Sequence, residues 1–198
     1  LFRTGYLAWG HNLDNPDPPF CHFTDRGERA MESAQRDPAN PDGYLAHLAQ
    51  VATISPISWS YLTEALDCYV GGMHKAAAVL LGGANERLAV DVRDAVLTFH
   101  QRHETKAPDA LIDWRIKRVL DALKAFFDRE KSRLAGELKE RYEAYWPAFT
   151  QQIRTIRNDA GHPSSIDPIS AEAVHAAFLV FPEVAGVSTA LIEWCEAT

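Results

Sequence analysis

From residue 56 onward, apolar residues recur at three- and four-residue steps, the spacing that is typical of amphipathic helices. Either Ser55 or Ser58 can cap a first helix, and the pair Gly71-Gly72 ends it. A second helix begins near Met73 and is apolar nearly all round. We therefore expect that helix to be central and buried.

Three more amphipathic segments follow, each bounded by residues that are common at helix ends. Their expected bounds are Ile116 to Tyr145, Pro147 to Gly161, and Ser170 or Asp167 to the C-terminal region. The pattern predicts an all-α body of about five helices, without an internal repeat.

The first 55 residues follow another pattern, with many Gly, Pro and Asn residues that form turns. Two short apolar pieces, 6–9 and 20–23, predict two strands around a long loop. A helix over about 25–34 and a linker over 36–43 are expected next. The sequence thus predicts a small irregular or β segment before the helical body.

The strand 20–23, followed by Thr24-Asp25-Arg26-Gly27, resembles the wing strand and closing helix of winged-helix domains. Residues 1–50 would then be the end of a truncated winged-helix domain, set apart from a helical domain over 56–198. The alternative is an irregular arm packed on the helical body. The chain begins with Leu1 rather than Met, so we expect a longer protein, whose DNA-binding helix would precede Leu1.

Composition narrows the class of protein. The chain has 198 residues and a net charge of −7, which argues against a general nucleic-acid binder but allows a local basic site. Cys21, Cys68 and Cys195 are far apart and form neither a disulfide framework nor a zinc motif. No apolar run approaches a membrane span and no signal peptide opens the chain, so we expect a cytoplasmic protein with no membrane partner.

The candidate chemistry lies in Arg157-Asn158-Asp159-Ala160-Gly161-His162. A guanidinium can hold a phosphate at two points, and an imidazole can move a proton near neutral pH. Arg157 and His162 would lie about 140° apart on a continuous helix, but a helix end at Gly161 lets His162 fold back. The alternative is a histidine that only stabilises a helix C-terminus.

Glu86 is a second candidate. It shares a side of the largely apolar second helix with Val79 and Val90, where a carboxylate needs a cation. We expect Glu86 to meet Arg157 in the core. The alternative is that Glu86 pairs with Arg87 or reaches solvent.

Other polar groups carry weaker signals. His100 and His103 have the spacing of a metal pair but no third ligand nearby, so no metal or cofactor is expected. Seven basic residues between 115 and 133 alternate with acidic ones, which favours a solvated, salt-bridged face over an RNA-binding stripe. Four aromatic residues are expected in the core or an interface, namely Trp114, Tyr142, Tyr145 and Trp146.

The pattern Arg-Asn-x-x-x-His, together with the segments EALDCYVGGMHKAAAVLLGGANERL and AEAVHAAFLVFPEV, resembles the HEPN superfamily, and within it the DUF4145 type. The resemblance covers roughly residues 56–197. It implies a helical bundle that often dimerises and so brings two Arg/His motifs to one cleft. Many such domains are metal-independent endoribonucleases of toxin–antitoxin and anti-phage defence systems, and others only bind or dimerise.

Carried onto this chain, the resemblance makes Arg157 and His162 the catalytic pair, supported by Asn158 and by the helix-two carboxylate Glu86. His162 would act as general acid or base, and Arg157 would stabilise the charged phosphorus centre. The expected substrate is RNA, and the expected products carry 2′,3′-cyclic phosphate ends. The expected partners are a second copy of the chain and an antitoxin or regulatory protein.

Two alternatives stay open at this point. One is a non-catalytic HEPN module that dimerises or senses a ligand within a larger regulatory or defence protein. The other is a regulatory protein that binds DNA through a winged helix, most of which would precede Leu1.

Overall fold

The computed structural model describes residues 2–3, 5–33, 36–161 and 169–198, with the backbone alone at 32–33, 152 and 154–161. The chain divides into two compact units, Leu1–His47 and Leu48–Thr198. It is predominantly α-helical, with seven α-helices and one two-stranded antiparallel sheet in the described ranges. The prediction of an all-α body preceded by a small β segment is confirmed as a fold class.

The first unit contains a short hairpin and a helix. Strands β1 (Leu7–Trp9) and β2 (Cys21–Phe23) pair antiparallel, with Leu7 opposite Phe23. Helix α1 (Asp25–Ser33) follows at once. The Thr24 hydroxyl accepts the N–H of Gly27 at 3.1 Å, as an N-cap residue does. The two predicted strands and the helix after them are confirmed.

Helix α2 (Pro41–Val51) was not predicted, because the run 36–43 has the composition of a linker. The predicted linker is therefore wrong over residues 41–43, which belong to α2. Pro41 begins the helix, where its missing N–H costs nothing. The Asn40 side chain accepts the N–H of Gly43 at 3.3 Å and caps the first turn.

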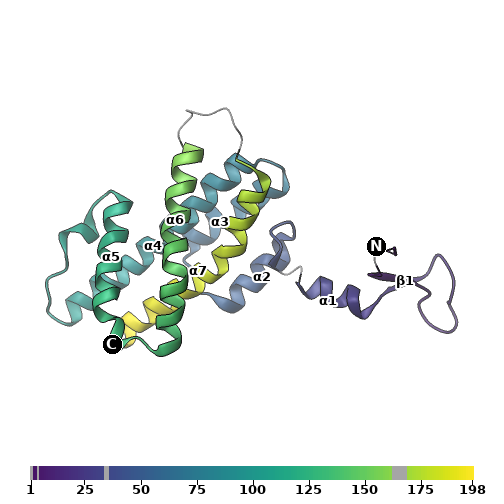
Figure 1. Cartoon of the computed structure of the whole chain (residues 1–198), viewed down its shortest axis with the longest axis horizontal. Coiled ribbons are helices and arrows are strands. Elements are labelled where there is room, and N and C mark those ends of the chain that lie inside the picture. The colour runs from purple at the N-terminus through teal and green to yellow at the C-terminus, as the bar shows by residue number, and fades with distance from the viewer. Residues whose placement is uncertain (1, 4, 34–35, 162–168) are drawn as a thin grey trace. The chain divides into compact units, whose positions relative to one another are not determined.

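The second unit is a bundle of five long helices (Figure 1). They are α3 (Pro56–Val70), α4 (His74–Arg102), α5 (Ile116–Glu130), α6 (Gly136–Gly161) and α7 (Ala171–Ala197). Helix α4 packs against the other four and is central, as predicted. Fully buried side chains come from all five helices, including Leu62, Leu66, Leu81, Leu123, Phe127, Ile153, Phe178 and Phe181.

The connection from α3 to α4 follows its local sequence. The Ser55 hydroxyl accepts the N–H of Ser58 at 3.4 Å and so caps α3. Gly71 ends α3, and Gly72 takes a left-handed φ of 73° that favours glycine. A Cβ atom on Gly83 of α4 would lie 2.7 Å from the Tyr61 ring, so the missing side chain lets α3 approach closely.

The predicted helix of about 30 residues from Ile116 to Tyr145 is wrong. Helix α5 ends at Glu130, a short 3-10 helix η3 (Lys131–Arg133) follows, and α6 begins at Gly136. The apolar spacing continues across this break because Leu134 in the connection is itself buried. Pro147, expected to open a new helix, instead lies inside α6.

Helix α7 is the most apolar of the bundle. Its mean hydropathy is 1.5 over an 18-residue window, so by length and composition it could cross a membrane. Half of that window is buried inside the chain, as in a core helix of a bundle. Val174, Phe178, Phe181 and Leu191 face inward as predicted.

Candidate functional site

The predicted motif begins in the last two turns of α6. The backbone is helical at Arg157 and Asn158, and α6 is described as far as Gly161. Whether the helix ends there, as the sequence predicts, lies outside the described residues. The side chains of Arg157 and Asn158 lie outside the described atoms, and His162 lies outside the described residues. The approach of His162 to Arg157 therefore stays a prediction.

At one end of the bundle α3 passes into α4, the described part of α6 ends and α7 begins (Figure 1). Ionisable side chains of α3, α4 and α7 lie close together there. The Tyr69 hydroxyl near the end of α3 lies 2.9 Å from Nδ1 of His175 in α7. The His74 ring, at the start of α4, lies 5.8 Å from the Tyr69 ring. Three helices thus place two imidazoles around one phenol, a group we call the Tyr69 cluster.

The Tyr69 cluster can take part in proton transfer. The Tyr69 hydroxyl and Nδ1 of His175 share one hydrogen bond, and the tautomer of the imidazole decides which of the two groups donates. Nδ1 of His74 is buried, and no described atom forms a hydrogen bond with it. Glu172 is close to this group. Hydrogen bonds from its own backbone N–H and from Ser170 hold its pKa below the ordinary value, with a further contribution from His74.

The sequence analysis did not single out Tyr69, His74 or His175. Tyr69 and His175 are 106 positions apart, so no local spacing joins them. A weak signal was present in His74, a polar residue two positions after the Gly71-Gly72 turn and the first residue of an apolar helix.

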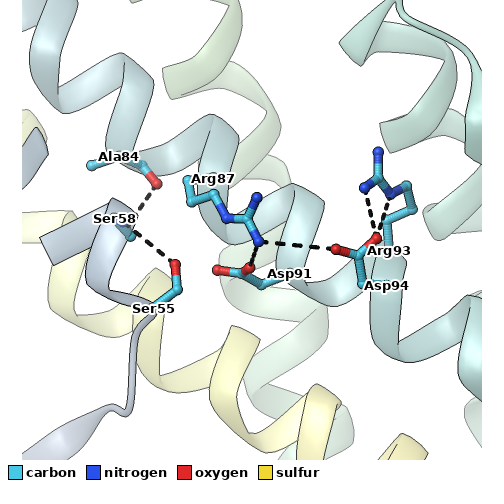
Figure 2. A network of polar contacts seen from close by, with 7 residues as sticks. All are labelled: Ser55, Ser58, Ala84, Arg87, Asp91, Arg93 and Asp94. Carbon is cyan, nitrogen blue, oxygen red and sulfur yellow. Dashed lines mark hydrogen bonds and ion pairs between the residues drawn. The ribbon is translucent and has the colours of Figure 1, made fainter.

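A second polar network runs along α4 (Figure 2). The buried Ser58 hydroxyl donates to the Ala84 carbonyl at 3.1 Å and ties α3 to α4. One turn further, Arg87 pairs with Asp91 at 2.5 Å and lies 3.9 Å from Asp94. Because its two arginines and two aspartates balance, with Arg93 bound to Asp94 at 2.6 Å, we assign this network to structure rather than to ligand binding.

Glu86 is half-buried on α4, between the Ser58 contact and the ion pairs. Its proposed partner Arg157 has no described side chain, so the Glu86–Arg157 pair stays a prediction. Arg87, the partner in the alternative interpretation, is engaged with Asp91.

The two histidines at the end of α4 have packing roles. Nδ1 of the buried His100 lies 2.7 Å from the Thr105 hydroxyl. The His103 ring stacks on Phe99, with ring centroids 4.1 Å apart, and its Nδ1 is 2.9 Å from the Phe99 carbonyl. Throughout the described ranges, no group of three or more His, Cys, Asp or Glu side chains could hold a metal ion.

The basic residues in and around α5 are mostly neutralised, which confirms the prediction of a salt-bridged face. The pairs are Arg115–Asp113, Arg118–Asp113, Lys124–Asp128, Arg129–Glu130, Lys131–Glu143 and Arg133–Glu130. Tyr142 and Trp146 are buried as expected, whereas Trp114 is 85% exposed and lies in no core.

Comparison of the chain with protein-family models, curated proteins and solved structures gives no match.

Proposed function

We propose that this chain is a metal-independent endoribonuclease of the HEPN type, acting as a toxin or anti-phage defence effector. One observation supports the proposal above all others. Arg157 and Asn158 lie in the last two described turns of a long helix, which the structure describes as far as Gly161, the residue before His162 in the sequence, within a bundle of five helices. A HEPN-like fold is part of this proposal.

The mechanism needs no cofactor. The ribose 2′-oxygen attacks the adjacent phosphorus, a new O–P bond forms, and the bond to the leaving 5′-oxygen breaks. A general base takes the 2′-proton and a general acid delivers a proton to the 5′-oxygen, so the products carry 2′,3′-cyclic phosphate and 5′-hydroxyl ends. Arg157 would stabilise the charge on the pentacoordinate phosphorus, and Asn158 would orient the phosphate or His162. Glu86 would hold Arg157 in place.

Two proton transfers call for two groups, and His162 supplies one. In a homodimer, the motif of the second subunit would supply the other. The Tyr69 cluster provides a further source at the same end of the bundle, because its two imidazoles, His175 and His74, lie beside the Tyr69 phenol. An antitoxin would neutralise the activity by covering this end.

The test is cleavage of single-stranded RNA by the purified chain in the presence of EDTA. His162→Ala and Arg157→Ala should each lower the rate by at least about 100-fold. His11→Ala and Arg29→Ala, which remove the same side-chain types from exposed positions in the first unit, should leave it unchanged. Cleavage that requires Mg²⁺, cuts DNA, or survives His162→Ala would exclude the mechanism.

A non-catalytic dimerisation module is the second candidate. It is favoured by exposed apolar side chains on α3 and α4, where Ile57 is 51%, Tyr61 44% and Val79 48% exposed. It is also favoured by the net charge of −7, which opposes binding of a polyanion. This candidate predicts a dimer in sedimentation analysis that Val79→Asp dissociates, and no RNA cleavage by the wild-type dimer.

A further inference from the structure

Trp114 lies almost fully in solvent, in the connection between the 3-10 helix η2 (Asp109–Ile112) and α5. Its exposed fraction is 85%, and that of Ile112, two positions earlier, is 72%. Tryptophan is highly buried on average in folded proteins. Because no core covers Trp114, its ring is open to contact with another molecule.

Asp113 fixes basic side chains beside the Trp114 ring. Nε and Nη2 of Arg115 donate to the two Asp113 carboxylate oxygens at 2.9 Å each. Nη1 of Arg118 donates to the same carboxylate at 2.8 Å. Cζ of Arg115 lies 5.8 Å from the centroid of the Trp114 ring, within the range of a cation–π contact. The ring and two guanidinium groups are thus held together before any ligand binds.

The group around Trp114 carries a net positive charge, unlike the one-to-one lysine–aspartate pair further along α5. Hydrogen bonds from Arg115 hold the pKa of Asp113 well below its ordinary value, so this carboxylate is ionised, but it faces two guanidinium groups. The exposed Lys117 forms no ion pair within the described ranges. Residues 113–118 therefore hold three positive charges and one negative charge, on a chain whose total charge is −7.

These cations do not serve the stability of α5. Lys117 and Arg118 lie in its first turn, which contains no acidic residue. The dipole of a helix favours anions at its N-terminus and cations at its C-terminus. Arg118 makes one hydrogen bond to Asp113 and is otherwise exposed, so most of its five N–H groups stay available. The placement therefore favours an anion that comes from another molecule.

A flat ring with cations beside it is the combination that binds single-stranded nucleic acid. A base offers a π-face to the indole, and the phosphates next to that base offer oxygens to guanidinium and ammonium groups. The paired bases of a duplex are stacked on each other and cannot reach the ring. An acidic peptide would engage the cations alone, and two exposed apolar side chains are too few for stable anchoring in a membrane.

We propose that Trp114 and the cations around it form a binding site for single-stranded nucleic acid. One base stacks on the exposed Trp114 indole, while the adjoining phosphates bind Arg118 and Lys117. The site uses stacking and charge rather than base edges, so it accepts RNA and DNA with little preference among bases. It involves none of the residues assigned to cleavage, and it goes beyond the proposed endoribonuclease function, to which it would add a second contact with the substrate.

The test is a titration of the full chain with oligothymidylate, followed by tryptophan fluorescence and by calorimetry. Oligothymidylate lacks the 2′-hydroxyl, so the proposed endoribonuclease cannot cleave it. Stacking should quench the fluorescence, and Trp114→Ala should remove this quenching and weaken binding at least about five-fold. Trp9→Ala, which removes an indole that is 53% exposed in the first unit, is the matched control and should leave the affinity unchanged.

Salt dependence tests the phosphate contacts separately. The slope of log Kd against log salt concentration should fall by about 0.7 in Lys117→Gln, because one phosphate contact of a single strand is lost. Lys75→Gln removes the same charge from an exposed position at the start of α4 and should keep the slope of the wild type. An unchanged slope in Lys117→Gln would contradict the phosphate contact on which the site depends.

Three further results would overturn the proposal. They are the absence of saturable oligothymidylate binding, equal affinities of the wild type and Trp114→Ala, and binding of polyglutamate as tight as that of oligothymidylate. The last result would indicate a site for acidic polypeptides. Sedimentation with phosphatidylserine vesicles that depends on Trp114, without oligothymidylate binding, would indicate a membrane contact instead.

Nucleic-acid binding and RNA cleavage fail separately. If both proposals hold, Trp114→Ala should raise KM for RNA at least about five-fold and leave kcat unchanged. RNA cleavage without oligothymidylate binding would leave the endoribonuclease proposal standing and remove the Trp114 site. Trp114-dependent binding without cleavage would support the site and remove the enzyme.

Discussion

The Tyr69 hydroxyl and Nδ1 of His175 lie 2.9 Å apart and join the end of α3 to the start of α7. This contact links parts of the chain that are distant in sequence, at the end of the bundle where α6 also ends. The contact therefore holds α3 against α7, in addition to placing an imidazole beside a phenol.

The Tyr69–His175 contact should appear as a coupling in a double-mutant cycle. Tyr69→Phe alone should lower the free energy of unfolding by about 0.5–1.5 kcal/mol, because one hydrogen bond is lost. With His175→Gln added, the two effects should deviate from additivity by at least about 0.5 kcal/mol in urea denaturation. Additive effects would mean that the two groups do not interact in solution.

Ser58→Ala should destabilise the bundle by about 1–2 kcal/mol, because the Ala84 carbonyl loses its hydroxyl donor in a fully buried position. Ser60→Ala on the same helix is exposed and serves as the control, with an expected change below about 0.5 kcal/mol. Chemical denaturation measures both. Equal effects of the two substitutions would argue against the α3–α4 tie.

Gly27→Ala should destabilise the first unit. A Cβ atom there would lie 2.1 Å from the Tyr6 carbonyl oxygen, and that backbone atom cannot move aside without disturbing the hairpin. The expected cost is about 1–3 kcal/mol, measurable as faster proteolysis of the N-terminal region. Gly136→Ala, where no atom lies within 4 Å, should not accelerate proteolysis.

His100 should make stability depend on pH. Burial, and then the charge of Arg129, hold its pKa below the ordinary value of 6.5. As the pH falls, the unfolded chain therefore takes up this proton first. The contribution of neutral His100 is fully present above about pH 6.5 and is lost as the pH falls from there through the lower folded-state pKa.

His100→Gln should consequently reduce the loss of unfolding free energy between pH 7 and pH 5. Urea denaturation at several pH values measures this slope, which is the change of the unfolding free energy with pH. The exposed His11→Gln variant should keep the slope of the wild type. An unchanged slope in His100→Gln would show that His100 is not the group responsible.

Local signals in the sequence identified most of the helix ends. Ser55, Gly71 and Ser170 act within one turn of their own position, so propensity and capping rules suffice for them. The start of α2 at Pro41 was missed because the same residue types form linkers and first helical turns. The break before Gly136 was missed because buried Leu134 keeps the apolar spacing in phase through the connection.

The candidate site was predictable only in part. Helical backbone at Arg157 follows from local sequence. The predicted helix end at Gly161 borders residues outside the described ranges and stays a prediction. The contact of Tyr69 with His175 depends on how α3 and α7 pack, and no periodicity within either helix encodes it.

The tight turn at Gly71-Gly72 also has a consequence for folding kinetics. It leaves only residues 71–73 between α3 and α4, the two helices with the most extensive mutual packing. Closing so short a loop costs little chain entropy, whereas α7 must close a loop of about seventy residues to reach α4. The α3–α4 hairpin should therefore form early, and substitutions in it should slow folding, while those in α7 should mainly accelerate unfolding.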